Sequence, residues 1–159
     1  DAQESRGLGD VYKRQLVQPT PEELKAVRRK APYRILHKDD TAHVVADNQT
    51  GITAYAAFET YSPAKDEIFL SIPAETMVMQ KQAGSKLLLS VCDPNLNISE
   101  KTYTTKEPSR PIEKKLILKG KWRSTAPNNK ITVHSNQTET VLIVTCQHGQ
   151  PVEFTLSRK

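Results

Sequence analysis

The residues most suited to chemistry are an aromatic side chain and the cations around it. Trp122 stands between Lys121 and Arg123, and an aromatic face can stack on sugar C–H groups while Lys and Arg pair with sulfate or carboxylate. The candidate carbohydrate-binding residues are Trp122, Lys119, Lys121, Arg123, Arg110 and Tyr103. The alternative stays open: the tryptophan belongs to a core and the cations lie on solvated strand faces.

Other polar clusters point to no catalytic site. His37 and His43 flank a turn that holds Asp39 and Asp40, but acids in turns usually face water rather than a cleft. The glycine patterns that bind phosphates, the GxSxG nucleophile motif and HExxH are absent. We therefore predict no catalytic residue, no metal site and no cofactor for this chain.

Two cysteines, Cys92 and Cys146, each lie in an apolar run. Two residues cannot form a disulfide-dense scaffold or a zinc site built from CxxC pairs. They are expected to be buried free thiols, or a single bridge between strands in an oxidising compartment.

The charge of the chain is concentrated in one short stretch. The 159 residues carry a net charge of +5, and residues 101–123 hold eight basic and two acidic side chains. Such a stretch favours an anionic surface or polymer as partner. Nucleic acid is not expected, because there is neither a basic reading helix nor a sheet with interleaved aromatics. No apolar run reaches the ~20 residues of a membrane helix, so no membrane contact is expected either.

The first 32 residues offer one helix. Residues 1–15 show no apolar periodicity and are interpreted as a flexible leader, not necessarily native to the domain. Thr20 can cap a helix that begins at Pro21 with Glu22 and Glu23 in its first turn, and Pro32 disfavours its continuation. The sequence therefore predicts one helix of about ten residues.

Everything after Pro32 has the pattern of β-strands. About ten short apolar or alternating segments are separated by turn residues, with no helical pattern between them, which indicates an all-β, antiparallel fold and favours a β-sandwich over a closed barrel. A boundary is expected near Pro73, with a few strands of an incomplete sandwich before it. The polar stretch 93–111 contains three prolines, and a loop of that length is often functional.

Several of these segments, in this order and spacing, resemble the C-terminal region of the family 8 polysaccharide lyases, and within it the chondroitin sulfate ABC lyases of Bacteroides-like bacteria. The segments that carry the resemblance are Ala42–Val45, Thr53–Glu59, the proline-led strand Ile72–Gln80, the hairpin strand Lys86–Asn97, Thr104–Pro111 and Leu118–Trp122. The resemblance covers roughly residues 17–159.

The resemblance implies a domain plan and a function. Residues 16–73 would hold the helix and the last strands of the central lyase sandwich, and residues 74–159 the C-terminal sandwich. Lyases of this family cleave glycosaminoglycans by β-elimination, but their catalytic Asn, His, Tyr and Arg lie upstream, so none is carried onto this chain. We expect a non-catalytic, secreted or periplasmic fragment whose partners are an acidic polysaccharide and the missing upstream domains. Two alternatives stay open: a stand-alone carbohydrate-binding module and a purely structural sandwich.

Overall fold

A computed structural model describes residues 20–29, 31–64, 67–98 and 109–158. The chain divides into two compact units, residues 1–32 and residues 33–159, and each is described by itself. The proposed leader, residues 1–15, lies outside the described residues, as do Tyr103 and most of the polar stretch. No helix in the described ranges is long and apolar enough to cross a membrane.

The helix of the first unit is α2, Pro21–Arg29. Thr20 and Glu23 cap it reciprocally: the Glu23 N–H donates to Thr20 Oγ1 at 3.2 Å, and the Thr20 N–H donates to Glu23 Oε2 at 2.7 Å. This exchange satisfies two backbone donors that would otherwise lack a partner at the first turn. The predicted short helix is confirmed, with Thr20 as its cap.

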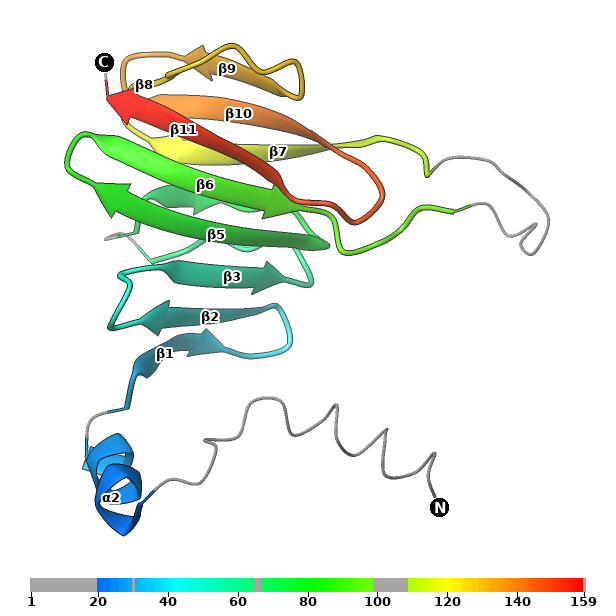
Figure 1. The fold of residues 1–159 in the computed structure, drawn as a ribbon. Coiled ribbons are helices and arrows are strands. Elements are labelled where there is room, and N and C mark those ends of the chain that lie inside the picture. The colour runs from blue at the N-terminus through cyan, green and yellow to red at the C-terminus, as the bar shows by residue number, and fades with distance from the viewer. Residues whose placement is uncertain (1–19, 30, 65–66, 99–108, 159) are drawn as a thin grey trace. The chain divides into compact units, whose positions relative to one another are not determined.

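The second unit consists of two antiparallel sheets (Figure 1). The larger has seven strands in the order β1-β2-β3-β5-β6-β11-β8, and the smaller has four in the order β4-β7-β10-β9. The strand bounds are β1 Tyr33–Lys38, β2 Ala42–Asp47, β3 Thr53–Ala57, β4 Phe69–Ser71, β5 Thr76–Ala83, β6 Lys86–Cys92, β7 Ile112–Lys119, β8 Trp122–Ser124, β9 Ile131–Ser135, β10 Glu139–Cys146 and β11 Val152–Arg158. The predicted all-β antiparallel fold is confirmed.

One apolar core fills the space between the sheets. Along β6 and β10, alternate residues are buried, as period-2 strands with one inward face require. Both sheets contribute: Leu87 and Leu156 come from the larger, Leu116 and Leu142 from the smaller, and all four are completely buried. The two sheets are therefore the layers of one sandwich.

The strands before residue 73 continue the same large sheet. Strand β3 pairs with β5 over five residues, from Thr53 opposite Gln80 to Ala57 opposite Thr76. The division at residue 73 into parts of two sandwiches stays a prediction, but the segments on either side of it share one hydrogen-bonded ladder. At the free edge, β1 has almost no buried residue, so the core ends at β2.

Candidate functional site

Trp122 lies in the core. Its side chain is completely buried, and its indole Nε1–H donates to the Lys119 carbonyl at 2.7 Å. The Arg158 guanidinium lies over the ring, 5.5 Å from its centroid. The ring offers no open face to a sugar, so its prediction as a stacking residue is wrong and the core alternative is right.

The turn before Trp122 explains this burial. Gly120 has a φ of 81°, a conformation that glycine adopts without strain, and the chain passes there from β7 in the small sheet to β8 in the large one. The Thr140 hydroxyl donates to the Gly120 carbonyl at 2.7 Å and accepts the Trp122 N–H at 2.9 Å. Trp122 therefore fixes the crossing between the sheets.

The predicted cations do not form one surface. Arg110 precedes β7, whereas Lys119, Lys121 and Arg123 lie at and beyond its other end, and an eight-residue strand separates them by about 25 Å. Arg110, Lys121 and Arg123 are exposed and Lys119 is half-buried, while Tyr103 lies outside the described residues. Arg123 also donates to the Ser157 hydroxyl at 3.2 Å. Their carbohydrate contact stays a prediction, now for two separate groups.

Another cation of the basic stretch is buried. Lys114 Nζ lies 3.1 Å from Asp93 Oδ2, with 6% of the Lys114 side chain and 2% of the Asp93 side chain exposed. The ammonium group also donates to the Ala74 carbonyl at 3.1 Å, and Asp93 Oδ1 accepts the Asn95 N–H at 2.8 Å. Each charge is thus paired and further hydrogen-bonded, as burial demands. This ion pair ties the start of β7 to the end of β6.

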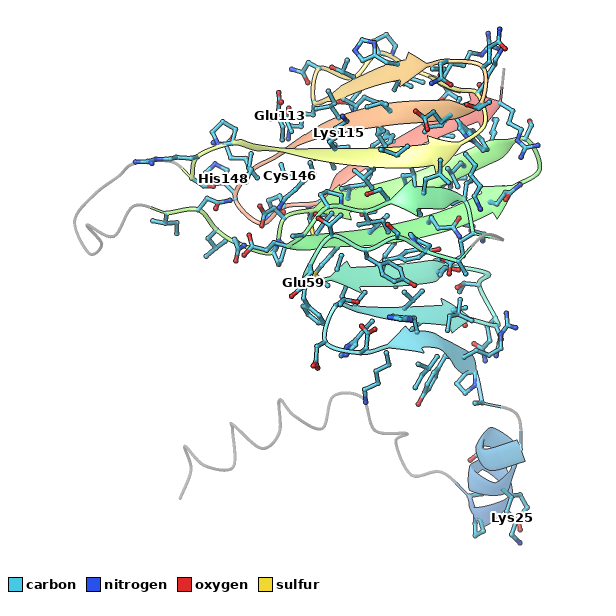
Figure 2. All side chains as sticks on the ribbon, turned by 180° about the vertical axis from the view of Figure 1, so that it is seen from behind. Lys25, Glu59, Glu113, Lys115, Cys146 and His148 are labelled. Carbon is cyan, nitrogen blue, oxygen red and sulfur yellow. The ribbon has the colours of Figure 1, made fainter. Side chains whose placement is uncertain are left out.

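Further polar contacts lie at the same end of the sandwich as this ion pair, near Cys146 and His148 (Figure 2). Ser109 is buried; its hydroxyl accepts the His148 N–H at 3.0 Å, and its carbonyl accepts a hydrogen bond from the Gln147 side chain. The turn is tight, since a Cβ atom on Gly149 would lie 3.2 Å from Leu96 Cδ2. The described residues that flank the long polar stretch are therefore held firmly at its two ends.

The histidines and cysteines that were considered as metal ligands or disulfide partners have structural roles. The rings of His37 and Tyr61 lie 4.9 Å apart, and those of His43 and Phe58 lie 5.1 Å apart. Cys92 and Cys146 are free thiols, and burial raises the pKa of each. Within the described ranges, no group of three or more His, Cys, Asp or Glu is placed to hold a metal ion.

Part of the β-sandwich matches a known domain family. Residues 34–102 match the family profile described as polysaccharide lyase family 8, C-terminal beta-sandwich domain. The predicted resemblance to the C-terminal region of polysaccharide lyase family 8 is therefore confirmed over these residues.

Three curated lyases are similar to this chain in sequence. The chain is 26% identical over 143 residues to the chondroitin sulfate ABC endolyase of Proteus vulgaris and 39% identical over 77 residues to the ABC exolyase of the same organism. It is 26% identical over 156 residues to the ABC exolyase of Bacteroides thetaiotaomicron. These matches cover 87%, 47% and 85% of this chain but only 13%, 8% and 15% of the relatives.

Solved structures support the fold. A Streptomyces coelicolor A3 chondroitin AC lyase, solved in complex with chondroitin sulphate, superimposes with a TM-score of 0.60 at 13% identity, over 89% of this chain and 17% of that one. A Paenibacillus xanthan lyase gives a TM-score of 0.64 at 16% identity, over 91% of this chain and 13% of that one. The same sandwich thus occurs in lyases with different named substrates.

Proposed function

We propose that this chain is a non-catalytic C-terminal part of a glycosaminoglycan lyase, one that acts on chondroitin sulfate, dermatan sulfate or hyaluronate by β-elimination. Its role is to stabilise the enzyme and to contribute carbohydrate contact. The observation that carries the proposal is the match of residues 34–102 to the C-terminal sandwich domain of the family. A secreted or periplasmic location, where such polymers occur, belongs to the same proposal.

The chemistry of the described side chains supports a non-catalytic role. β-Elimination needs a base near the proton α to a uronate carboxylate and a partner that neutralises that carboxylate. Asp39 Oδ1 instead accepts hydrogen bonds from the Thr41 hydroxyl and from the N–H groups of Ala42 and Thr41, and these turn hydrogen bonds hold the pKa of Asp39 well below its usual range. Asp93 is neutralised by Lys114 in the interior. These carboxylates serve turns and packing.

Incubation of the chain with chondroitin sulfate tests the proposal. The expected result is no increase in the ultraviolet absorbance of unsaturated uronate. Continuous product formation by the chain would contradict it.

The second candidate function is a stand-alone carbohydrate-binding module, favoured by Lys121 and Arg123, which are both exposed and lie two positions apart in the sequence. Retention on a chondroitin sulfate resin, weakening as salt rises, would favour this candidate. Elution in the void at low salt would eliminate it. Since Trp122 is buried, any such retention must come from cations and hydrogen bonds.

A further inference from the structure

The outer face of the large sheet, on the side away from the core, is largely apolar, whereas a sheet face turned to water is usually polar. Directly opposed residues of antiparallel strands lie on one face, so the register identifies the members of this face. The outer patch consists of these residues of β1, β2, β3, β5 and β6: Ile35, Val45, Ala54, Ala56, Met77, Met79 and Leu88. The five strands are neighbours in the sheet (Figure 1), so the outer patch is continuous.

The outer patch is exposed and large. Both methionines of the chain lie in it, Met77 with 44% and Met79 with 54% of the residue exposed. By contrast, the exposed outward residues of β7 and β9 in the small sheet are all polar: Glu113, Lys115, Thr132 and His134. With strands about 4.8 Å apart and outward positions about 7 Å apart, the outer patch covers roughly 400 Å², a size that usually marks a contact site.

The side chains of the outer patch are matched in size about its middle strand, β3. The outward residues of β3, Ala54 and Ala56, are small. The larger Val45 and Met79 lie directly beside Ala54, on β2 and β5. A low strip therefore follows β3 between higher rows on both sides, and a second sheet can approach closely along it.

A hollow and two protruding side chains lie at equal distances from β3. The hollow has a volume of about 460 Å³, and its lining includes Met79, Leu88 and Glu153, from β5, β6 and β11. On the other side of β3, strand β1 carries Tyr33 and Ile35, which are 52% and 58% exposed. Because β1 and β6 are each two strands away from β3, a half-turn about β3 brings β1 of one copy over β6 of another.

Charge is matched about β3 as well. Asp47 on β2 and Lys81 on β5 are the outward residues that flank Ile52, one on either side. Hydrogen bonds from the Thr50 hydroxyl and the Gln49 N–H lower the pKa of Asp47, so its carboxyl group stays ionised. Within the described residues, neither Asp47 nor Lys81 forms an ion pair. The same half-turn sets each of the two charges opposite its complement.

We propose that the outer patch binds a second copy of this chain, with the large sheets of the two protomers packed back to back around a two-fold axis along β3. Tyr33 and Ile35 of each protomer lie over the partner's hollow, and Lys81 faces the partner's Asp47. Ala54 of one protomer lies opposite Ala54 of the partner subunit. The two patches with their rims would bury about 1,000 Å² in total, so the dimer is expected to be weak, with a micromolar Kd. The proposal goes beyond the proposed function and does not rest on it.

Sedimentation velocity of the full chain between about 5 and 200 µM tests the association, and the sedimentation coefficient should rise with concentration. Met79→Lys should weaken dimerisation at least about tenfold, because it buries an ammonium group without a partner. Lys81→Glu should also weaken it, because the new carboxylate would face the partner's Asp47. Lys115→Glu, a change at an exposed residue of the small sheet, is the matched control and should dimerise like the parent chain.

Cross-linking tests the position of the two-fold axis. In a chain with Cys92→Ser, which removes the half-exposed thiol, Ala54→Cys should give a covalent dimer with a short bismaleimide, because the two Ala54 positions face each other. Thr132→Cys, on the outer face of the small sheet, is the control and should stay monomeric under the same conditions.

A single monomeric species at about 200 µM would overturn the proposal and leave the outer patch to a different partner. Association that persists unchanged in Met79→Lys would also overturn it, because the contact would then lie elsewhere, as at the free edge of β1. Equal cross-linking of Thr132→Cys and Ala54→Cys would contradict the axis. Circular dichroism shows whether each variant is folded, and Lys81→Glu covers the case in which Met79→Lys is not. These outcomes leave the non-catalytic role untouched, because elimination is measured separately by absorbance.

Discussion

The Nζ atom of Lys114 lies 3.1 Å from Oδ2 of Asp93, inside the sandwich and across its two sheets. Lys114 lies in the inward-facing row of β7, in phase with the buried Leu116 and Leu118. The pair therefore replaces an apolar contact at the end of the core, and the additional hydrogen bond to the Ala74 carbonyl brings the segment before β5 into the same junction.

Lys114→Met should destabilise the chain by about 3–5 kcal/mol, because it leaves the Asp93 carboxylate buried without a counter-charge. The double variant with Asp93→Asn should recover most of this loss, because neither remaining side chain is charged. Urea denaturation measures both. Lys115→Met is the control, since Lys115 is exposed on the opposite face of β7 (Figure 2), and equal losses for the two lysines would contradict the account.

Trp122 is the only tryptophan of the chain, so its fluorescence reports directly on its burial. We expect a blue-shifted emission that acrylamide quenches poorly and that chondroitin sulfate leaves unchanged. Trp122→Ala should cost about 3–5 kcal/mol of unfolding free energy, as for other large core truncations, while Arg123→Ala should stay within about 0.5 kcal/mol. Strong quenching by acrylamide, or protection from quenching by the polymer, would restore the stacking role.

The tight turn at Gly149 can be tested against Gly51, a glycine in another turn that serves as the matched control. Both have positive φ, 64° and 70°, but a Cβ atom on Gly149 would lie 3.2 Å from Leu96 while one on Gly51 meets nothing within 4 Å. Gly51→Ala should cost about 1–2 kcal/mol from backbone strain alone, and Gly149→Ala should cost more. Thermal or urea unfolding measures the loss of stability in each variant. A smaller loss for Gly149→Ala than for Gly51→Ala would contradict the tight turn.

Alkaline pH should destabilise the fold through Tyr55. Its pKa is raised above the ordinary 10.0, mainly by burial, so the unfolded chain loses this proton first. The stabilisation is complete below about pH 10 and falls as the pH rises toward the folded pKa. Tyr55→Phe should make the decline less steep, without abolishing it, because burial also raises the pKa of Tyr61. An unchanged slope in unfolding free energy against pH would contradict this.

Alternation in the sequence predicted the strands well, and local signals predicted the helix. The helix cap is predicted by the pattern of Thr20, Pro21 and Glu23. Strand β10 is predicted by the apolar run before Cys146. Strand β8 is not evident in the sequence because three residues cannot show a period, and it pairs with β11, whose partner residues lie 32 to 36 positions away. Nor does the sequence show that β3 pairs with β5, because register between distant segments is a tertiary property.

The site was harder to predict than the fold. A tryptophan between two cations is compatible with a surface or a core, and only the turn at Gly120 decides for the core. The burial of Lys114 did leave a signal, since it shares the phase of Leu116 and Leu118.

Prolonged incubation of the purified chain at high concentration with chondroitin sulfate, dermatan sulfate and hyaluronate is the most direct test of a non-catalytic role. The absorbance of unsaturated uronate is followed, with an active chondroitin lyase as positive control. The account predicts a flat trace with all three polymers while the control reaches completion. A rate that scales with the concentration of this chain would contradict it.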